Sequence, residues 1–198
     1  MFSILRILGA TLAMTFSIQA AVEPALVKKV EDYLNGIKTY RARILQTNDN
    51  GSTQKGWFYM ERGGKKQFGK MRIEYDTPIK DLIIVDGREF IFYDSQAKEK
   101  NTYGIDATPA AFLLRRKIDL HNELKIMEKA VDGNDLGLKV IRSGDESGAA
   151  LILKFSTAPI FKLNGWAVID PQGLMTRVHL EEVNIGMNLD ANLFKYND

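Results

Sequence analysis

The sequence predicts a mainly β protein, in which one strongly curved antiparallel sheet forms an incomplete barrel with one helix before it and one inserted mid-chain. Three observations support this class. Apolar residues recur at helical spacing only near the start of the chain, and afterwards they alternate with polar residues. Turn signals separate the alternating segments. No repeat, low-complexity tract or interdomain linker divides the 198 residues, which favours a single domain.

The first twenty residues differ from the rest. A single cation, Arg6, precedes an apolar run over 7–16, and small residues follow up to Ala20 and Ala21. This pattern is typical of a secretory signal peptide cleaved near those two alanines. The run is too short for a membrane span, and a short uncleaved anchor is the alternative. Residues 21–198 would then form the exported domain.

Charge and cysteine content limit the classes of function that the chain could have. The chain has 27 Lys and Arg against 25 Asp and Glu, a net charge of +2. This balance gives no reason to expect nucleic acid or an anionic membrane surface as a partner. The sequence has no cysteine, so the exported domain must be stable without disulfides and has no cysteine that could bear a lipid. We therefore expect it to be soluble where it is exported.

The first predicted element of the exported domain is a helix over Pro24–Ile37. Pro24 suits a first turn and Gly36 suits a helix end. Its apolar stripe consists of Leu26, Val30, Tyr33, Leu34 and Ile37.

A period of two then dominates. In 70–76, for example, Met71, Ile73 and Tyr75 fall on one face. Strands are predicted over 40–47, 56–62, 70–76, 81–85, 89–94, 150–156, 165–170 and 175–183. Turn signals lie at 48–51, 86–87 and 171–173.

The mid-chain segment 107–117 interrupts this pattern. Thr108 can cap a helix, Pro109 suits its first position, and three cations end it. A short helix is therefore predicted over Thr108–Arg116.

Nucleotide and metal sites are not supported. The stretch Gly64–Met71 approaches a phosphate-binding loop, but Met71 replaces the metal-binding Ser or Thr, and a strand follows where a helix is needed. Only His121 and His179 could be nitrogen ligands, and they lie far apart. Residues 132–135 lack the ligand spacing of a calcium loop and are predicted to form a turn. No metal or cofactor is expected.

No catalytic constellation is evident. The chain has no Gly-x-Ser-x-Gly elbow. The adjacent Glu181 and Glu182 would point to opposite faces of a strand and could not share a site. We expect no enzyme, and a hydrolase with an unrecognised site is the alternative.

Large apolar side chains gather on one predicted sheet face. They are either an ordinary core or the wall of a lipid-sized cavity, and periodicity cannot separate the two. The candidate wall residues are Phe58, Met60, Met71, Ile73, Tyr75, Phe90, Phe92, Leu151, Leu153 and Phe155.

An ordered set of segments gives a family resemblance. They are "YLNGIKTYRARILQT", "GWFYMER", "GKMRIEYDTP", "IIVDGREFIFYD", "TPAAFLL", "KLNGWAVIDPQG" and "TRVHL". Together they resemble the outer-membrane lipoprotein carrier family, LolA. The chain departs from the family pattern where extra residues lengthen the turn at Gly63–Phe68, and where Ile73 replaces the usual Phe.

The resemblance implies an unclosed antiparallel β-barrel, closed by helices that act as a lid over an apolar cavity for acyl chains. It implies a monomeric periplasmic chaperone that carries acylated lipoproteins. The implied partners are an inner-membrane ATP-driven lipoprotein-release complex and an outer-membrane lipoprotein receptor. The alternative is a periplasmic module that binds another lipid or glycolipid on the same scaffold.

The resemblance also suggests a lid and its latch. Phe112, Leu113 and Leu114 would cover the cavity mouth, and the alternative is a helix packed permanently into the core. Strand alternation places Arg62 on the inward face with Phe58 and Met60. The resemblance suggests that Arg62 binds backbone carbonyls of the lid helices.

Two alternatives to this role of Arg62 are open. Arg62 could be a solvated arginine at a strand end. Arg72 is a second candidate, but alternation assigns it to the outer face with Glu74 and Asp76.

Overall fold

One antiparallel sheet of eleven strands is the framework of the computed structural model, which describes residues 22–64, 68–105 and 109–197. The strand order is β6-β5-β4-β3-β2-β1-β11-β10-β9-β8-β7. The first and last strands do not pair with each other, so the predicted mainly β, unclosed barrel is confirmed. The predicted signal peptide and its cleavage near Ala20 or Ala21 lie outside the described residues.

The strands of the first half are β1 Thr39–Thr47, β2 Thr53–Glu61, β3 Lys70–Tyr75, β4 Leu82–Val85, β5 Glu89–Asp94 and β6 Glu99–Gly104. Those of the second half are β7 Leu124–Asp132, β8 Asp135–Arg142, β9 Ala150–Ser156, β10 Lys162–Ile169 and β11 Met175–Ile185. Eight of them match predicted strands within a few residues. The sequence analysis did not identify β6, β7 and β8, although the turn that joins β7 to β8 lies where a turn was expected.

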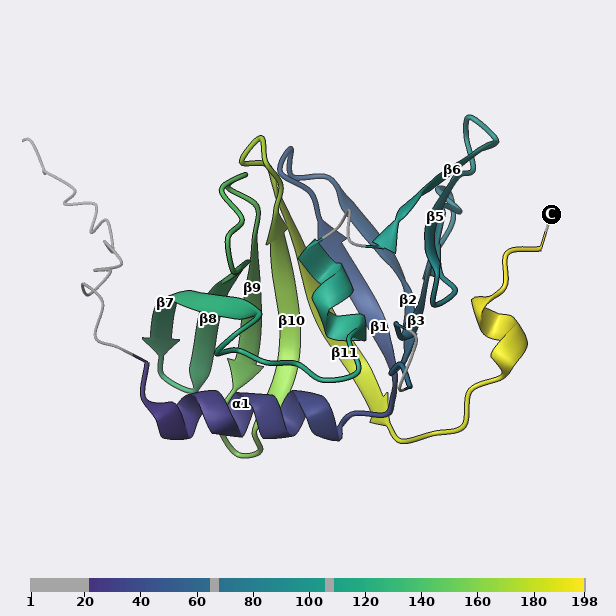
Figure 1. Ribbon diagram of the computed structural model, residues 1–198. Helices are drawn as coiled ribbons and strands as arrows, with labels where there is room; N and C mark the ends of the chain where they lie inside the picture. Colours follow the sequence, from purple (N-terminus) through teal and green to yellow (C-terminus); the bar gives the residue numbers. More distant parts are fainter. Residues whose placement is uncertain (1–21, 65–67, 106–108, 198) are drawn as a thin grey trace, which may run out of the picture.

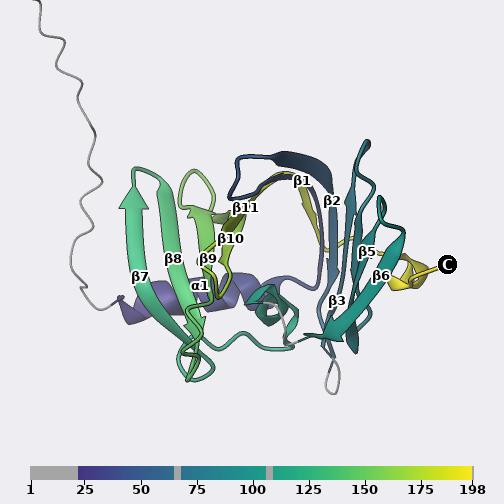
Figure 2. The same cartoon turned by 90° about the horizontal axis from the view of Figure 1, so that it is seen from above.

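The sheet curves into two limbs joined at the pair β1 and β11 (Figures 1 and 2). One limb runs from β2 to β6 and the other from β10 to β7. Helix α1, Pro24–Gly36, crosses one end of this arch. A 3₁₀ helix, η2, Pro109–Leu114, lies in the mouth between the limbs.

Two glycines permit the strong bend. A Cβ atom on Gly56 of β2 would lie 2.2 Å from the carbonyl oxygen of Glu74, and one on Gly165 of β10 would lie 2.2 Å from that of Val178. Real Cβ atoms do not approach backbone this closely. Only glycine therefore allows each strand to cross its neighbour at these points.

Helix α1 forms for the reasons that the sequence gives. Pro24 stands in its first turn, and its apolar stripe faces the arch, with Val30 and Leu34 fully buried. Tyr33 extends the contact, because its ring meets Phe155 and Phe161 edge-on at centroid distances of 6.0 and 5.5 Å. The helix is thereby packed against the limb that contains β9 and β10.

The mid-chain helix is shorter than predicted. The expected Thr108–Arg116 helix is the 3₁₀ helix Pro109–Leu114, and the predicted cap Thr108 lies outside the described residues. The helix closes tightly because the backbone N–H of Arg115 donates to the carbonyl of Phe112, three residues earlier. In the described part of the chain, no helix has the length and apolar character needed to cross a membrane.

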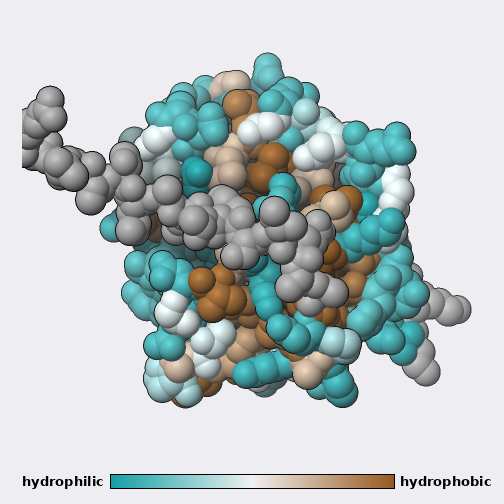
Figure 3. Space-filling model, turned by 90° about the vertical axis from the view of Figure 1, so that its left-hand side faces the viewer, coloured by the Kyte–Doolittle hydropathy of each residue, from teal (hydrophilic) through white to brown (hydrophobic). Residues whose placement is uncertain are grey.

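The outer face of the β3–β5 limb is covered by the C-terminal segment. In the short 3₁₀ helix η3, Ala191–Phe194, the side chain of Phe194 is buried. At the opposite limb, seen from the β7 side, apolar side chains reach the surface between polar ones (Figure 3). Met127 and Val131 of β7 are among the exposed apolar residues of the molecule.

Candidate functional site

The predicted wall residues converge on the inside of the arch. Eight of the ten are buried in one continuous apolar cluster, and they come from β2, β3 and β9. Phe90 and Phe92 of β5 are half-buried near the edge of the sheet, and Phe90 packs against the cluster. The buried eight are Phe58, Met60, Met71, Ile73, Tyr75, Leu151, Leu153 and Phe155.

Little space remains beside Tyr40, Phe58 and Met60 on the inside of the arch. Between the helices and the sheet remains a cavity of about 10 Å³. That volume holds at most about one water molecule. Its lining comprises Leu34, Ile37, Tyr40, Phe58, Met60, Arg62, Leu113, Leu163 and Trp166. This structure therefore leaves no space for an acyl chain at this position.

The predicted lid side chains close this interior. Phe112, Leu113 and Leu114 are each at most 6% exposed. Leu113 faces the small cavity, whereas Phe112 lines a second, larger pocket. The segment η2 thus separates the two spaces.

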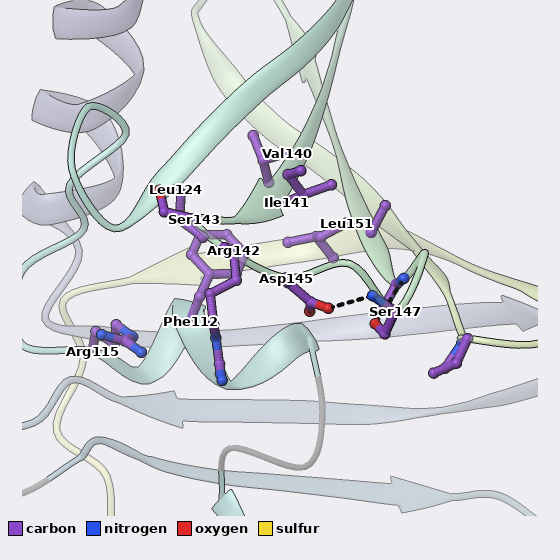
Figure 4. A pocket seen from close by; sticks show the side chains of 14 residues that line it. Phe112, Arg115, Leu124, Val140, Ile141, Arg142, Ser143, Asp145, Ser147 and Leu151 are labelled. Carbon is purple, nitrogen blue, oxygen red and sulfur yellow. Dashed lines mark hydrogen bonds between the residues drawn. The ribbon is translucent and has the colours of Figure 1, made fainter.

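The second pocket lies between η2 and the β8–β9 end of the sheet and has a volume of about 480 Å³ (Figure 4). Volumes of about 300–1,000 Å³ are typical of ligand pockets. Its apolar wall includes Phe112, Leu124 and Leu151, and the side chain of Arg142 extends toward η2. The loop at its rim is ordered by the backbone N–H of Ser147, which donates to Asp145 Oδ1 at 2.8 Å.

Arg62 joins the two helical elements to the end of β2. Its Nε donates to the carbonyl of Ile37 at 2.8 Å, and its Nη2 donates to that of Leu34 at 2.7 Å, both at the end of α1. Its Nη1 donates to the carbonyls of Leu113 and Arg115, at 3.0 and 2.8 Å. The side chain of Arg62 therefore binds four backbone carbonyls. Two belong to the end of α1 and the residue after it, and two belong to the end of η2 and the residue after it.

The charge of this guanidinium is stabilised by carbonyl dipoles. None of the ion pairs found among the described residues involves Arg62, and burial lowers the pKa of its guanidinium to about 10. At neutral pH the group stays charged. A buried charge without acceptors is costly, so the carbonyls and the guanidinium depend on each other.

Gly69 is a second contact to the lid, and the sequence analysis did not identify it. Its backbone N–H donates to the carbonyl of Leu114 at 2.6 Å. A Cβ atom there would lie 2.5 Å from the carbonyl oxygen of Glu61 and 2.9 Å from that of Leu114. This glycine of the lengthened turn is needed for close approach to η2, while residues 65–67 of the turn lie outside the described residues.

Asn35 and Glu31 of α1 hold the segment after η2, and both were missed as well. Asn35 Nδ2 donates to the carbonyl of Ile118 at 3.0 Å, and Asn35 Oδ1 accepts from its N–H at 2.8 Å. Glu31 Oε1 accepts from the N–H of Leu120 at 2.7 Å. These bonds join the segment that follows η2 to α1, while Arg62 holds the C-terminal end of η2 itself.

Arg72 lies on the outer face, as alternation predicted. Its Nε donates to Glu74 Oε1 at 2.6 Å and its Nη1 to the carbonyl of Leu193 at 3.0 Å. It binds the C-terminal segment, and no hydrogen bond or ion pair found among the described residues joins it to α1 or η2.

The strand is irregular at the glutamate pair, where strict alternation was expected. Glu182 has φ of 48°, and the pairing of β1 with β11 shifts at this point. The resulting bulge breaks the alternation, so Glu181 and Glu182 are both exposed.

The bonds of Arg62 are independent of the sheet. Every partner of Arg62 is a backbone carbonyl, so releasing η2 need not break any strand pairing. The small cavity behind it is lined mainly by large apolar side chains. The arrangement suits reversible exposure of an apolar interior.

Comparison with known proteins gives one matching family. The model of the family described as outer membrane lipoprotein carrier protein LolA matches residues 35–197. An outer-membrane lipoprotein carrier protein of Methylococcus capsulatus is 24% identical over 91% of this chain and 86% of its own length. The corresponding protein of Pseudomonas aeruginosa is 29% identical over 94% of this chain and 90% of its own.

A solved structure shares the fold. It is a putative outer membrane lipoprotein-sorting protein domain from Vibrio parahaemolyticus, with a TM-score of 0.51 and 11% identity. The match covers 86% of this chain and 94% of that one. At this identity the likeness concerns the fold alone.

Proposed function

Because this chain belongs to the outer-membrane lipoprotein carrier family, LolA, we propose that it is a periplasmic chaperone that carries lipoproteins from the inner to the outer membrane. The acyl chains of the cargo occupy the inside of the arch after the lid, residues 109–115, has moved. The cargo comes from an inner-membrane ATP-driven release complex and passes to an outer-membrane lipoprotein receptor. The carrier acts as a monomer.

The free energy of exposing acyl chains to water makes an apolar binding site necessary. Removing an acyl chain from water contributes about 0.8 kcal/mol per methylene, so a sixteen-carbon chain represents roughly 12 kcal/mol. Free transit of such a chain through water would be negligible. An apolar interior offsets this cost without any catalytic group.

The observation that carries the proposal is the bonding of Arg62. One buried guanidinium connects α1 and η2 through the carbonyls of Leu34, Ile37, Leu113 and Arg115. These four bonds form the latch of the closed state. Entry of cargo breaks them, and their recovery on closing favours delivery of the cargo over its retention.

The proposal predicts which molecules co-purify with the protein from a native periplasm. Native mass spectrometry should recover intact acylated lipoproteins, because only an occupied interior keeps their chains from water. Recovery of free glycolipid alone would instead favour a carrier of other lipids on this scaffold. Recovery of cleaved acyl chains would favour a hydrolase.

A further inference from the structure

The hydroxyl of Tyr40 stands out inside the closed arch. Tyr40 is 2% exposed, its ring lies 5.9 Å from that of Phe58, and it lines the small cavity. Within the described ranges, its hydroxyl has no hydrogen-bond partner. Leaving such a buried group unpaired destabilises a folded state, because its bond to water is lost and not replaced.

Two other tyrosines of this interior, the buried Tyr75 and the partly buried Tyr33, do have partners. The hydroxyl of Tyr75 donates to Gln46 Oε1 at 2.6 Å, and that of Tyr33 accepts from the backbone N–H of Leu163 at 3.0 Å. The same interior thus satisfies two tyrosine hydroxyls and leaves a third unpaired. An unpaired group in a native core calls for an explanation, and a ligand absent from the closed form is one.

The chemistry around Tyr40 specifies what this ligand must offer. The polar side chains that line the cavity are those of Tyr40, Arg62 and Trp166. Guanidinium and indole groups only donate hydrogen bonds, and a tyrosine hydroxyl can donate. Burial raises the pKa of Tyr40, so its hydroxyl keeps its proton. A fitting ligand therefore brings a hydrogen-bond acceptor.

We propose that the Tyr40 hydroxyl donates a hydrogen bond to an ester or amide carbonyl at the head of the cargo's acyl chains. This inference rests on the proposed carrier function and names the chemistry that the interior recognises. When cargo breaks the four bonds of Arg62, the guanidinium also needs acceptors, and it lines the same cavity as Tyr40. The carrier then prefers acyl chains that have carbonyls over plain alkyl chains.

Two matched lipopeptides test the proposal. One has two ester-linked sixteen-carbon chains, and the other has the same chains joined through ethers and so lacks the carbonyls. The wild-type protein should bind the ester form about two- to tenfold more tightly, the range that one hydrogen bond supplies. Tyr40→Phe should lower this preference and bind the ether form as the wild type does.

The melting temperature of the empty protein gives a second measurement. Tyr40→Phe should melt at or above the wild-type temperature, because it removes an unpaired hydroxyl. The control Tyr75→Phe should melt lower, because it removes a paired one.

Each contrary outcome has a distinct meaning. Equal binding of both lipopeptides by the wild type, or an undiminished ester preference in Tyr40→Phe, overturns this inference and leaves the carrier function standing. A melting temperature of Tyr40→Phe as low as that of Tyr75→Phe shows that the hydroxyl is already paired and also overturns it. Failure of the wild type to bind either lipopeptide overturns the carrier function and this inference together.

Discussion

Arg62→Leu should still load lipoprotein but deliver it to the receptor at least about tenfold more slowly than the wild type. The substitution removes all four carbonyl contacts of the closed state while the cavity wall stays apolar. Losing even one hydrogen bond to a charged group, about 1.5–3 kcal/mol, changes an equilibrium by roughly tenfold or more. Without these bonds the empty closed form is less stable relative to the loaded form, so the protein retains its cargo.

Transfer to purified receptor measures this effect, and two variants control it. Arg72→Leu removes a guanidinium that binds Glu74 and the carbonyl of Leu193 on the outer face, so its transfer should be normal. Arg62→Lys keeps the charge but cannot reproduce the planar fork, so its defect should be intermediate. Normal transfer by Arg62→Leu would show that Arg62 is not a latch.

Leu113→Asp should release bound cargo at least about tenfold faster while the domain remains folded. Leu113 is 6% exposed and lines the small cavity, so a carboxylate at this position must reach water and displace η2. Strand pairing does not depend on η2, because η2 lies outside the sheet. Cargo dissociation and thermal unfolding, measured on the same preparation, check the two parts of this result.

The matched control is Leu153→Asp. Leu153 is 0% exposed and lies in β9, between two paired strands. Its replacement buries a charge within the sheet itself and should abolish the thermal transition. If Leu113→Asp abolished the transition as well, η2 would be a permanent part of the core and not a lid.

The strands that could be predicted are those in which every second residue is apolar and buried. In β9, Leu151, Leu153 and Phe155 are buried while Lys154 is exposed, as alternation requires. β8 has the same signal in Leu136, Leu138 and Val140 and could have been found by it.

β6 and β7 could not be predicted in this way. Every residue of β6 is exposed, so the strand has no apolar face, and it forms only as an edge on β5. In β7 the pairing with β8 shifts between Ile126 and Glu128, which breaks the period of two at the other edge.

The candidate site was predictable only in part. Alternation along β2 correctly placed Arg62 on the inward face, because that argument needs only local geometry. The contacts of Gly69 and Asn35 join residues far apart in the chain, at Leu114 and Ile118. No spacing rule within a single segment encodes such contacts.

Release of lipoproteins from membranes is the most direct test of the carrier function. Purified protein is added to spheroplasts that synthesise a labelled, acylated lipoprotein destined for the outer membrane. The account predicts that the lipoprotein appears in the soluble fraction, still acylated and bound to one copy of this protein. A lipoprotein that stays in the membrane fraction, with the added protein empty, would contradict it.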